Sequence, residues 1–116
     1  MRVQLEAQSL RLRIDEAELA RLLAGEAVEN RTQLPDGRID SQRLQLGPDL
    51  AWQREHDAWQ LVLPATDVRA LSERLPSRAG LQFAMSVPGA QALQILFDID
   101  VRDSARKRLP RSGEAS

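Results

Sequence analysis

Apolar and polar residues alternate along residues 9–14, and a helical spacing follows within a few positions. The apolar residues there alternate with two arginines, as a strand with one buried face requires. Asp15 is suited to cap a helix, and Glu18, three residues later, completes a capping box. The pattern therefore predicts a strand that leads directly into a short helix over residues 16–24, which Gly25 ends.

Alternation predicts further strands along the chain. The segments that carry it are residues 2–6, 50–54, 59–63, 81–87 and 93–99. A second short helix is expected near residues 65–75, where apolar residues recur at helical spacing, and Pro76 ends it. Residues 27–46 contain few apolar positions, so we expect edge strands or a loop there and not a central strand.

The hairpin expected between residues 50 and 63 depends on its turn. If His56 and Asp57 form a two-residue turn, Arg54 lies opposite Trp59, and its guanidinium could cover the indole ring. A three-residue turn would break this pairing, so the register stays open at this point.

Together these segments predict an α+β domain over residues 1–101. We expect a mainly antiparallel sheet of about six to eight strands, with two short helices packed on one face. Residues 102–116 have no apolar periodicity and include a basic run, so we predict a disordered basic tail. No internal repeat is visible in the sequence.

The composition excludes several kinds of site. The chain has no cysteine and one histidine, which rules out disulfides, thiolate nucleophiles and Cys/His metal clusters. No glycine-rich phosphate loop is present, and no G-x-S-x-G surrounds a serine. His56 lies between two acidic residues at a predicted turn, so we expect it to be solvated. We therefore predict neither a catalytic residue nor a cofactor.

Charge and hydropathy limit the partners. The formal charge of −1 gives no reason to expect nucleic acid as a partner. No apolar run resembles a signal peptide, and none approaches the roughly 18 apolar residues of a membrane span. With the lack of cysteine, this predicts a cytoplasmic protein that does not bind membranes.

The most promising functional residues are arginines on the first two predicted strands. Arg2, Arg11 and Arg13 occupy the polar faces of these segments and would gather on one surface if the strands pair. Guanidinium groups bind carboxylate and phosphate through two parallel hydrogen bonds, so this surface suits an anionic ligand or an acidic partner. Glu6 shares the face and would neutralise part of its charge. The alternative interpretation is an ordinary solvated strand face.

A second group of polar residues lies on the last predicted strand. Asp98 and Asp100 are two residues apart and point to the same side, where carboxylates could bind a hard cation such as Mg²⁺ or Ca²⁺. The same pattern is typical of the solvent-facing half of an amphipathic edge strand. We regard them as weak candidates for a metal site.

The stretch Ser9–Ile14, with the cap and short helix up to Gly25, resembles a family of small uncharacterised bacterial proteins. Members have an N-terminal Ser-Leu-Arg-Leu-Arg-Ile/Leu strand followed by a capped short helix. Residues 61–64, Leu-Val-Leu-Pro, are similar to the family's strand that enters a second helix. Typical members end in an acidic segment that contains cysteine, whereas this chain ends in a basic segment without it. The resemblance implies a compact α+β domain and supplies no activity.

The sequence therefore favours a non-catalytic binding or interaction module. We expect it to recognise a small anionic ligand or an acidic protein partner through the face that carries Arg2, Arg11 and Arg13. One alternative is a metal-dependent phosphate-handling enzyme that uses Asp98 and Asp100 with the arginines. Another is a homo-oligomeric structural protein assembled through a sheet edge.

Overall fold

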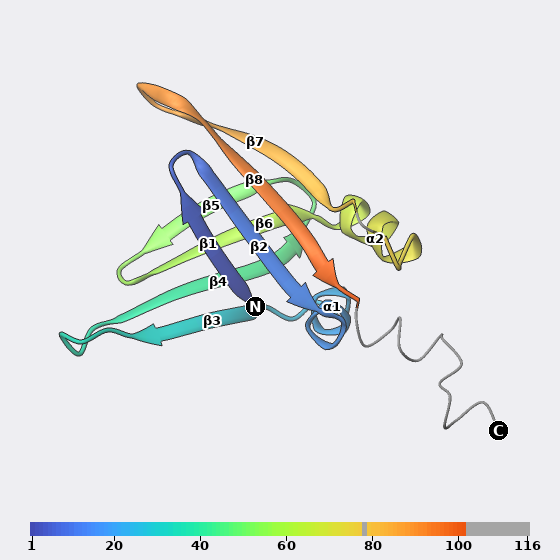
Figure 1. The fold of residues 1–116 in the computed structure, drawn as a ribbon, viewed down its shortest axis with the longest axis horizontal. Helices are drawn as coiled ribbons and strands as arrows, with labels where there is room; N and C mark the ends of the chain where they lie inside the picture. Colours follow the sequence, from blue (N-terminus) through green and yellow to red (C-terminus); the bar gives the residue numbers. More distant parts are fainter. Residues whose placement is uncertain (78, 102–116) are drawn as a thin grey trace.

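The computed structural model describes residues 1–77 and 79–101, and within them the α+β class is confirmed (Figure 1). The elements, in chain order, are β1 (Arg2–Glu6), β2 (Ser9–Asp15), α1 (Glu16–Leu23), β3 (Val28–Gln33), β4 (Ile39–Gly47), β5 (Ala51–Glu55), β6 (Ala58–Pro64), α2 (Ala65–Glu73), β7 (Leu81–Val87) and β8 (Ala90–Asp100). The tail expected over residues 102–116 lies outside the described residues.

The strands form two mixed sheets instead of the single sheet that we expected. Sheet A has the order β1-β2-β8-β7, and sheet B has the order β3-β4-β6-β5. In each sheet two antiparallel hairpins are joined by one parallel pair, β2 with β8 or β4 with β6. Alternation revealed the strands of three of the hairpins, which are neighbours in sequence, but not those of the β3–β4 hairpin. It could not reveal the parallel joins, whose strands are distant in sequence.

The helices lie between the sheets and not on one face of a single sheet. Both are at the same end of the molecule, where β2 and β6 end (Figure 1). Helix α1 contacts β2 and β8 of sheet A and β3 and β4 of sheet B, while α2 contacts β7 of sheet A and β4 and β6 of sheet B. Each helix therefore closes this end of the core, and the expected one-face arrangement is corrected.

Local signals around α1 are confirmed. The Asp15 side chain accepts a hydrogen bond from the backbone N–H of Glu18 at 2.7 Å, and the Asp15 N–H donates to the Glu18 carboxylate at 3.1 Å. Gly25 follows the helix with a φ of +92°, a conformation that glycine adopts without strain. The cap fixes the angle at which the chain leaves β2 for the core.

The hairpin of β5 and β6 has the register predicted from a two-residue turn. Arg54 lies opposite Trp59, and Trp52 lies opposite Leu61. The ring contact of Trp59 is made by Trp52 and not by Arg54: the two indoles stack with centroids 4.5 Å apart and planes inclined by 26°. Trp52, the diagonal neighbour of Trp59, thus covers the indole ring that we expected the Arg54 guanidinium to cover.

Residues 27–46 contain a central strand, contrary to our expectation. β4 lies between β3 and β6, and its Leu44 is fully buried. Few apolar residues are needed because polar positions on the inner face satisfy one another: the Asn30 side-chain amide donates to the Gln42 side-chain oxygen at 2.8 Å. A strand with little apolar character can therefore occupy the middle of a sheet.

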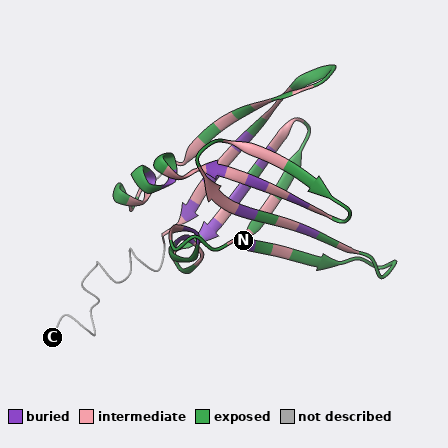
Figure 2. Cartoon of the chain, turned by 180° about the vertical axis from the view of Figure 1, so that it is seen from behind, coloured by how far each residue is buried: buried purple, intermediate pink, exposed green. Residues whose placement is uncertain are grey.

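The core joins the inner faces of both sheets to one side of each helix (Figure 2). The largest fully buried side chains are those of Phe97, Leu10, Leu12, Ile14, Leu22, Leu44, Leu61, Leu63, Leu71, Ile95, Val28 and Val68. Because the apolar residues of β2 and β8 face this core, the arginines at the alternate positions of β1 and β2 are directed outward.

The two halves of the described chain repeat one ββαββ arrangement, which the sequence did not show. β1-β2-α1-β3-β4 corresponds to β5-β6-α2-β7-β8, and exchanging the halves converts the strand order of sheet A into that of sheet B. The turns match as well, since Ala7 and His56 take positive φ angles of 48° and 52° at equivalent positions. Some matched core residues are identical, such as Leu12 and Leu61, but others share only apolar character, such as Leu10 and Trp59, and this partial match does not show as a repeat in the sequence.

Candidate functional site

The pairing of β1 with β2 brings the predicted arginines together. Arg2 lies opposite Arg13, and Gln4 lies opposite Arg11. These four residues line a hollow of about 100 Å³ on the outer surface of sheet A. We call Arg2, Arg11 and Arg13 the arginine face. The prediction that they share one surface is confirmed.

Asp98 of β8 binds two of the three arginines. Arg11 donates from Nε and Nη2 to Asp98 Oδ2 at 3.1 and 2.9 Å, and Arg13 donates from Nε to Oδ1 at 2.7 Å. The Asp98 side chain is 19% exposed, against 45% for Arg11 and 36% for Arg13. One shielded carboxylate therefore fixes the orientation of two guanidinium groups that remain accessible.

Sequence reasoning missed this partnership. Asp98 was a candidate metal ligand, because nothing local places it beside arginines that precede it by 85 and 87 residues. The parallel pairing of β2 with β8 sets Arg13 directly opposite Asp98. Only the long-range register, which no local pattern encodes, reveals the contact.

The arginines of this face keep hydrogen-bond donors that no described residue uses. Within residues 1–77 and 79–101, Arg2 makes no ion pair or side-chain hydrogen bond, and Arg13 uses only Nε toward Asp98. A guanidinium carries several N–H donors in a planar fork. Donors of Arg2, Arg11 and Arg13 thus remain for an external oxyanion.

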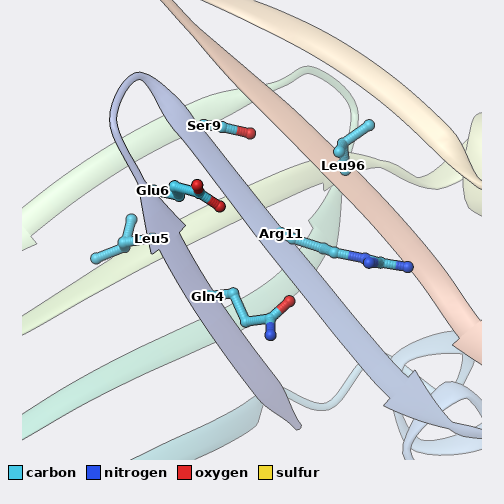
Figure 3. Close-up of a pocket in the computed structure, with 6 residues that line it drawn as sticks. All are labelled: Gln4, Leu5, Glu6, Ser9, Arg11 and Leu96. Carbon is cyan, nitrogen blue, oxygen red and sulfur yellow. The ribbon is translucent and has the colours of Figure 1, made fainter.

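A second, larger hollow adjoins the first and shares Arg11. Its volume is about 500 Å³, and its lining consists of Gln4, Leu5, Glu6, Ser9, Arg11 and Leu96. Figure 3 shows Arg11 extending from β2 toward β8, while Leu5 points away on the far side of β1. Glu6 adds one negative charge to this hollow, as expected from its place on the same face. Arg2 and Arg13 also line a neighbouring hollow with Asp15, Glu18 and Asp100, so acidic side chains border the arginine face on that side too.

The other predicted site residues lie elsewhere or have other partners. His56 is exposed in the turn between β5 and β6. Both carboxylate oxygens of Asp98 accept hydrogen bonds from arginine, which leaves that residue poorly suited to bind a cation. In the described part of the chain, no group of three or more His, Asp or Glu side chains is arranged to hold a metal ion.

A separate ionic cluster lies on the outer surface of sheet B. Ser41, only 8% exposed, donates from Oγ to Glu29 at 2.5 Å, and Arg43 donates to the same carboxylate at 3.4 Å. The hydrogen bond from Ser41, helped by Arg43, lowers the pKa of Glu29 although partial burial opposes the shift. This cluster holds Glu29 ionised and ties β3 to β4.

No protein-family model matches this chain, and no curated protein matches its sequence. The resemblance drawn from residues 9–25 therefore stays a prediction. Among the described residues, no helix has the length and apolar character needed to cross a membrane. What can be argued about function comes from the geometry of the sheets.

Proposed function

We propose that this protein is a non-catalytic binding module whose arginine face recognises an anionic group, a phosphate or a carboxylate. One observation carries the proposal: three guanidinium groups border a single hollow, and one partly buried carboxylate orients two of them. Oriented guanidiniums lose less side-chain entropy on binding than free ones. The anion would be carried by a small ligand or by an acidic segment of a protein partner.

Comparison of the two halves supports a role beyond folding. The positions of Arg11, Arg13 and Asp98 in sheet A correspond to Gln60, Val62 and Gln45 in sheet B. There, Gln60 donates to Gln45 at 3.2 Å along the same diagonal between strands. The fold is therefore compatible with neutral side chains at these positions, and folding alone does not account for the charges.

The test is to give sheet A the residues of sheet B. The triple variant Arg11→Gln, Arg13→Val, Asp98→Gln should fold, because the same contacts occur in the other half. Inorganic phosphate and an oligoglutamate peptide are titrated at low salt, with amide chemical shifts as the readout. We expect saturable shifts at β1 and β2 in the natural chain and their loss in the triple variant.

A matched control is available on the other sheet. Arg43→Gln also removes a positive charge from an outer sheet surface, but it leaves the arginine face intact. We expect this variant to bind both probes as the natural chain does. If Arg43→Gln and the triple variant weakened binding of the two probes equally, the binding would depend only on the net charge of the protein, and a specific site would be refuted.

The alternatives have less support from the geometry. A metal-dependent phosphate-handling enzyme would need Asp98 to release its two arginines before it could bind a cation. Titration with Mg²⁺, monitored through the melting temperature of the protein, tests this because an ion that binds specifically stabilises the folded state by mass action.

Assembly into a homo-oligomer through a sheet edge would appear as an increase in molecular mass in light scattering. A cytoplasmic location and a bacterial source remain part of our proposal.

A further inference from the structure

An apolar cleft lies on the side of the molecule away from the arginine face. It has a volume of about 340 Å³ and is lined by Trp52 of β5, by Met85, Ser86, Val87 and Pro88 of the β7–β8 hairpin, and by Leu93 of β8. Trp52, Met85 and Leu93 are half-buried, so the cleft is open to solvent yet mostly hydrocarbon. Its volume falls within the roughly 300–1,000 Å³ of small-molecule sites.

The internal repeat shows that the fold does not require this apolar lining. The Met85–Leu93 pair of sheet A corresponds to the Thr32–Asp40 pair of sheet B, which has the same register and is exposed and polar. Trp52 corresponds to Val3, which is smaller but also apolar. The Met85–Leu93 pair is thus apolar in one half only, whereas a requirement of the fold would make the pair apolar in both halves.

Arg54 does not line the cleft but follows one of its residues on the same strand. Arg54 is two residues beyond Trp52 on β5 and so shares its face, and it pairs across the hairpin with Trp59. Within residues 1–77 and 79–101, Arg54 forms no ion pair, and its side chain is exposed. The following Glu55 points to the opposite face of the strand. The cleft therefore has a hydrocarbon wall, and one exposed guanidinium extends from the same face of β5, two residues from Trp52.

We propose that this cleft binds the hydrocarbon chain of a single-chain anionic amphiphile, a fatty-acid-like carboxylate, with its head group at Arg54. The charge complementarity selects an anion over a neutral or cationic amphiphile. The volume of the cleft favours a small ligand, since a docked helix is about 10–12 Å in diameter and would need a larger groove. The site is distinct from the arginine face, so the two proposals stand or fall separately.

The chain contains its own reporter for the test. Its only two tryptophans, Trp52 and Trp59, stack beside the cleft, and there is no tyrosine. Decanoate and the uncharged 1-decanol are titrated below their aggregation limits while tryptophan emission is followed. We expect saturable binding of one decanoate, with 1-decanol about 3- to 5-fold weaker, as an exposed ion pair would give. Arg54→Gln should remove this difference and keep the alcohol's affinity.

Two further variants separate the cleft from general hydrophobicity. Met85→Thr with Leu93→Asp introduces the residues of the other half and should abolish binding of both probes. Leu34→Ser changes an exposed leucine in the β3–β4 loop and should leave binding unchanged. Arg54→Gln alters only an exposed side chain, so its result remains decisive if the double variant does not fold.

Three outcomes would overturn the proposal. The first is no saturable change of emission below the aggregation limit. The second is equal affinity for decanoate and 1-decanol in the natural chain. The third is emission that changes on dilution without ligand, together with a change of mass, because a second copy of the chain would then occupy the cleft.

Discussion

Gln60 donates a hydrogen bond to Gln45 across β6 and β4, at the place in sheet B that Arg11 and Asp98 occupy in sheet A. Both sheets therefore have a diagonal side-chain contact between parallel strands, but the side chains are charged in sheet A and neutral in sheet B. Charge on this surface can accordingly be changed without losing the contact, and this allows binding and stability to be measured separately.

Replacing Asp98 should strengthen anion binding. Asp98→Asn removes the negative charge that competes for Arg11 and Arg13 but keeps an amide oxygen that can still orient one of them, and it leaves two like charges as neighbours on β2. We expect phosphate affinity to rise several-fold and stability to fall by about 1 kcal/mol. Amide shift titrations and thermal melts measure the two effects. Unchanged affinity would mean that the arginines are not the binding groups.

The cap of α1 should contribute measurably to stability. Asp15→Ala removes the side-chain half of the capping box, the hydrogen bond that Asp15 accepts from the Glu18 N–H, and should cost about 1 kcal/mol, or about 4 °C in melting temperature. The equivalent residue at α2 is Pro64, which makes no side-chain cap bond. Thr66→Ala in the first turn of α2 is therefore a suitable control and should change stability by less than about 0.5 kcal/mol. Equal losses in both variants would argue against the cap.

Two apolar residues of sheet A should respond very differently to truncation. Phe97 is fully buried and Leu5 is 67% exposed. Phe97→Ala should destabilise the fold by about 3–5 kcal/mol, because it leaves a cavity between the sheets. Leu5→Ala should change stability by less than about 0.5 kcal/mol. Urea unfolding curves distinguish the two, and a large loss with Leu5→Ala would show that a contact covers this residue in solution.

Glu29 should give the protein a specific acid sensitivity. Its pKa in the folded state is lowered, mainly by the hydrogen bond from Ser41, so its stabilising contribution is complete above the unfolded-state pKa. That contribution is lost as the pH falls through the lowered folded-state pKa. Ser41→Ala should raise the pKa of Glu29 and flatten the acid side of the melting profile. A carboxyl-carbon titration of Glu29 checks this, and an unchanged pKa would exclude the Ser41 bond as its cause.

Local features of the fold were predictable from sequence, while the assembly of the sheets was not. Asp15, Glu18 and Gly25 marked α1 because capping depends on residues a few positions apart. The turn at His56 set the register of β5 and β6 for the same reason. Alternation along β2 or β8 shows which face is buried but not which strand is the neighbour. The parallel joins, the central place of β4 and the repeat follow from such distant pairings.

In the candidate site, too, the features set by neighbouring residues were predictable and those set by distant strand pairing were not. That Arg2, Arg11 and Arg13 share a surface followed from alternation and a single hairpin. That Asp98 binds two of them followed from the parallel pairing of β2 with β8, which the sequence does not display. The apolar cleft was missed for a different reason, since alternation assigns residues such as Met85 to the core whether or not the core covers them.

The repeat has a consequence for how the chain must assemble. Each half contributes one hairpin to each sheet, so neither half alone contains a complete sheet. A chain cut between β4 and β5, near Asp49, would yield two fragments that regain both sheets only on meeting each other. Recovery of the fold would then depend on fragment concentration. The two halves of the polypeptide thus depend on each other to complete the sheets, as the subunits of an interlocked dimer do.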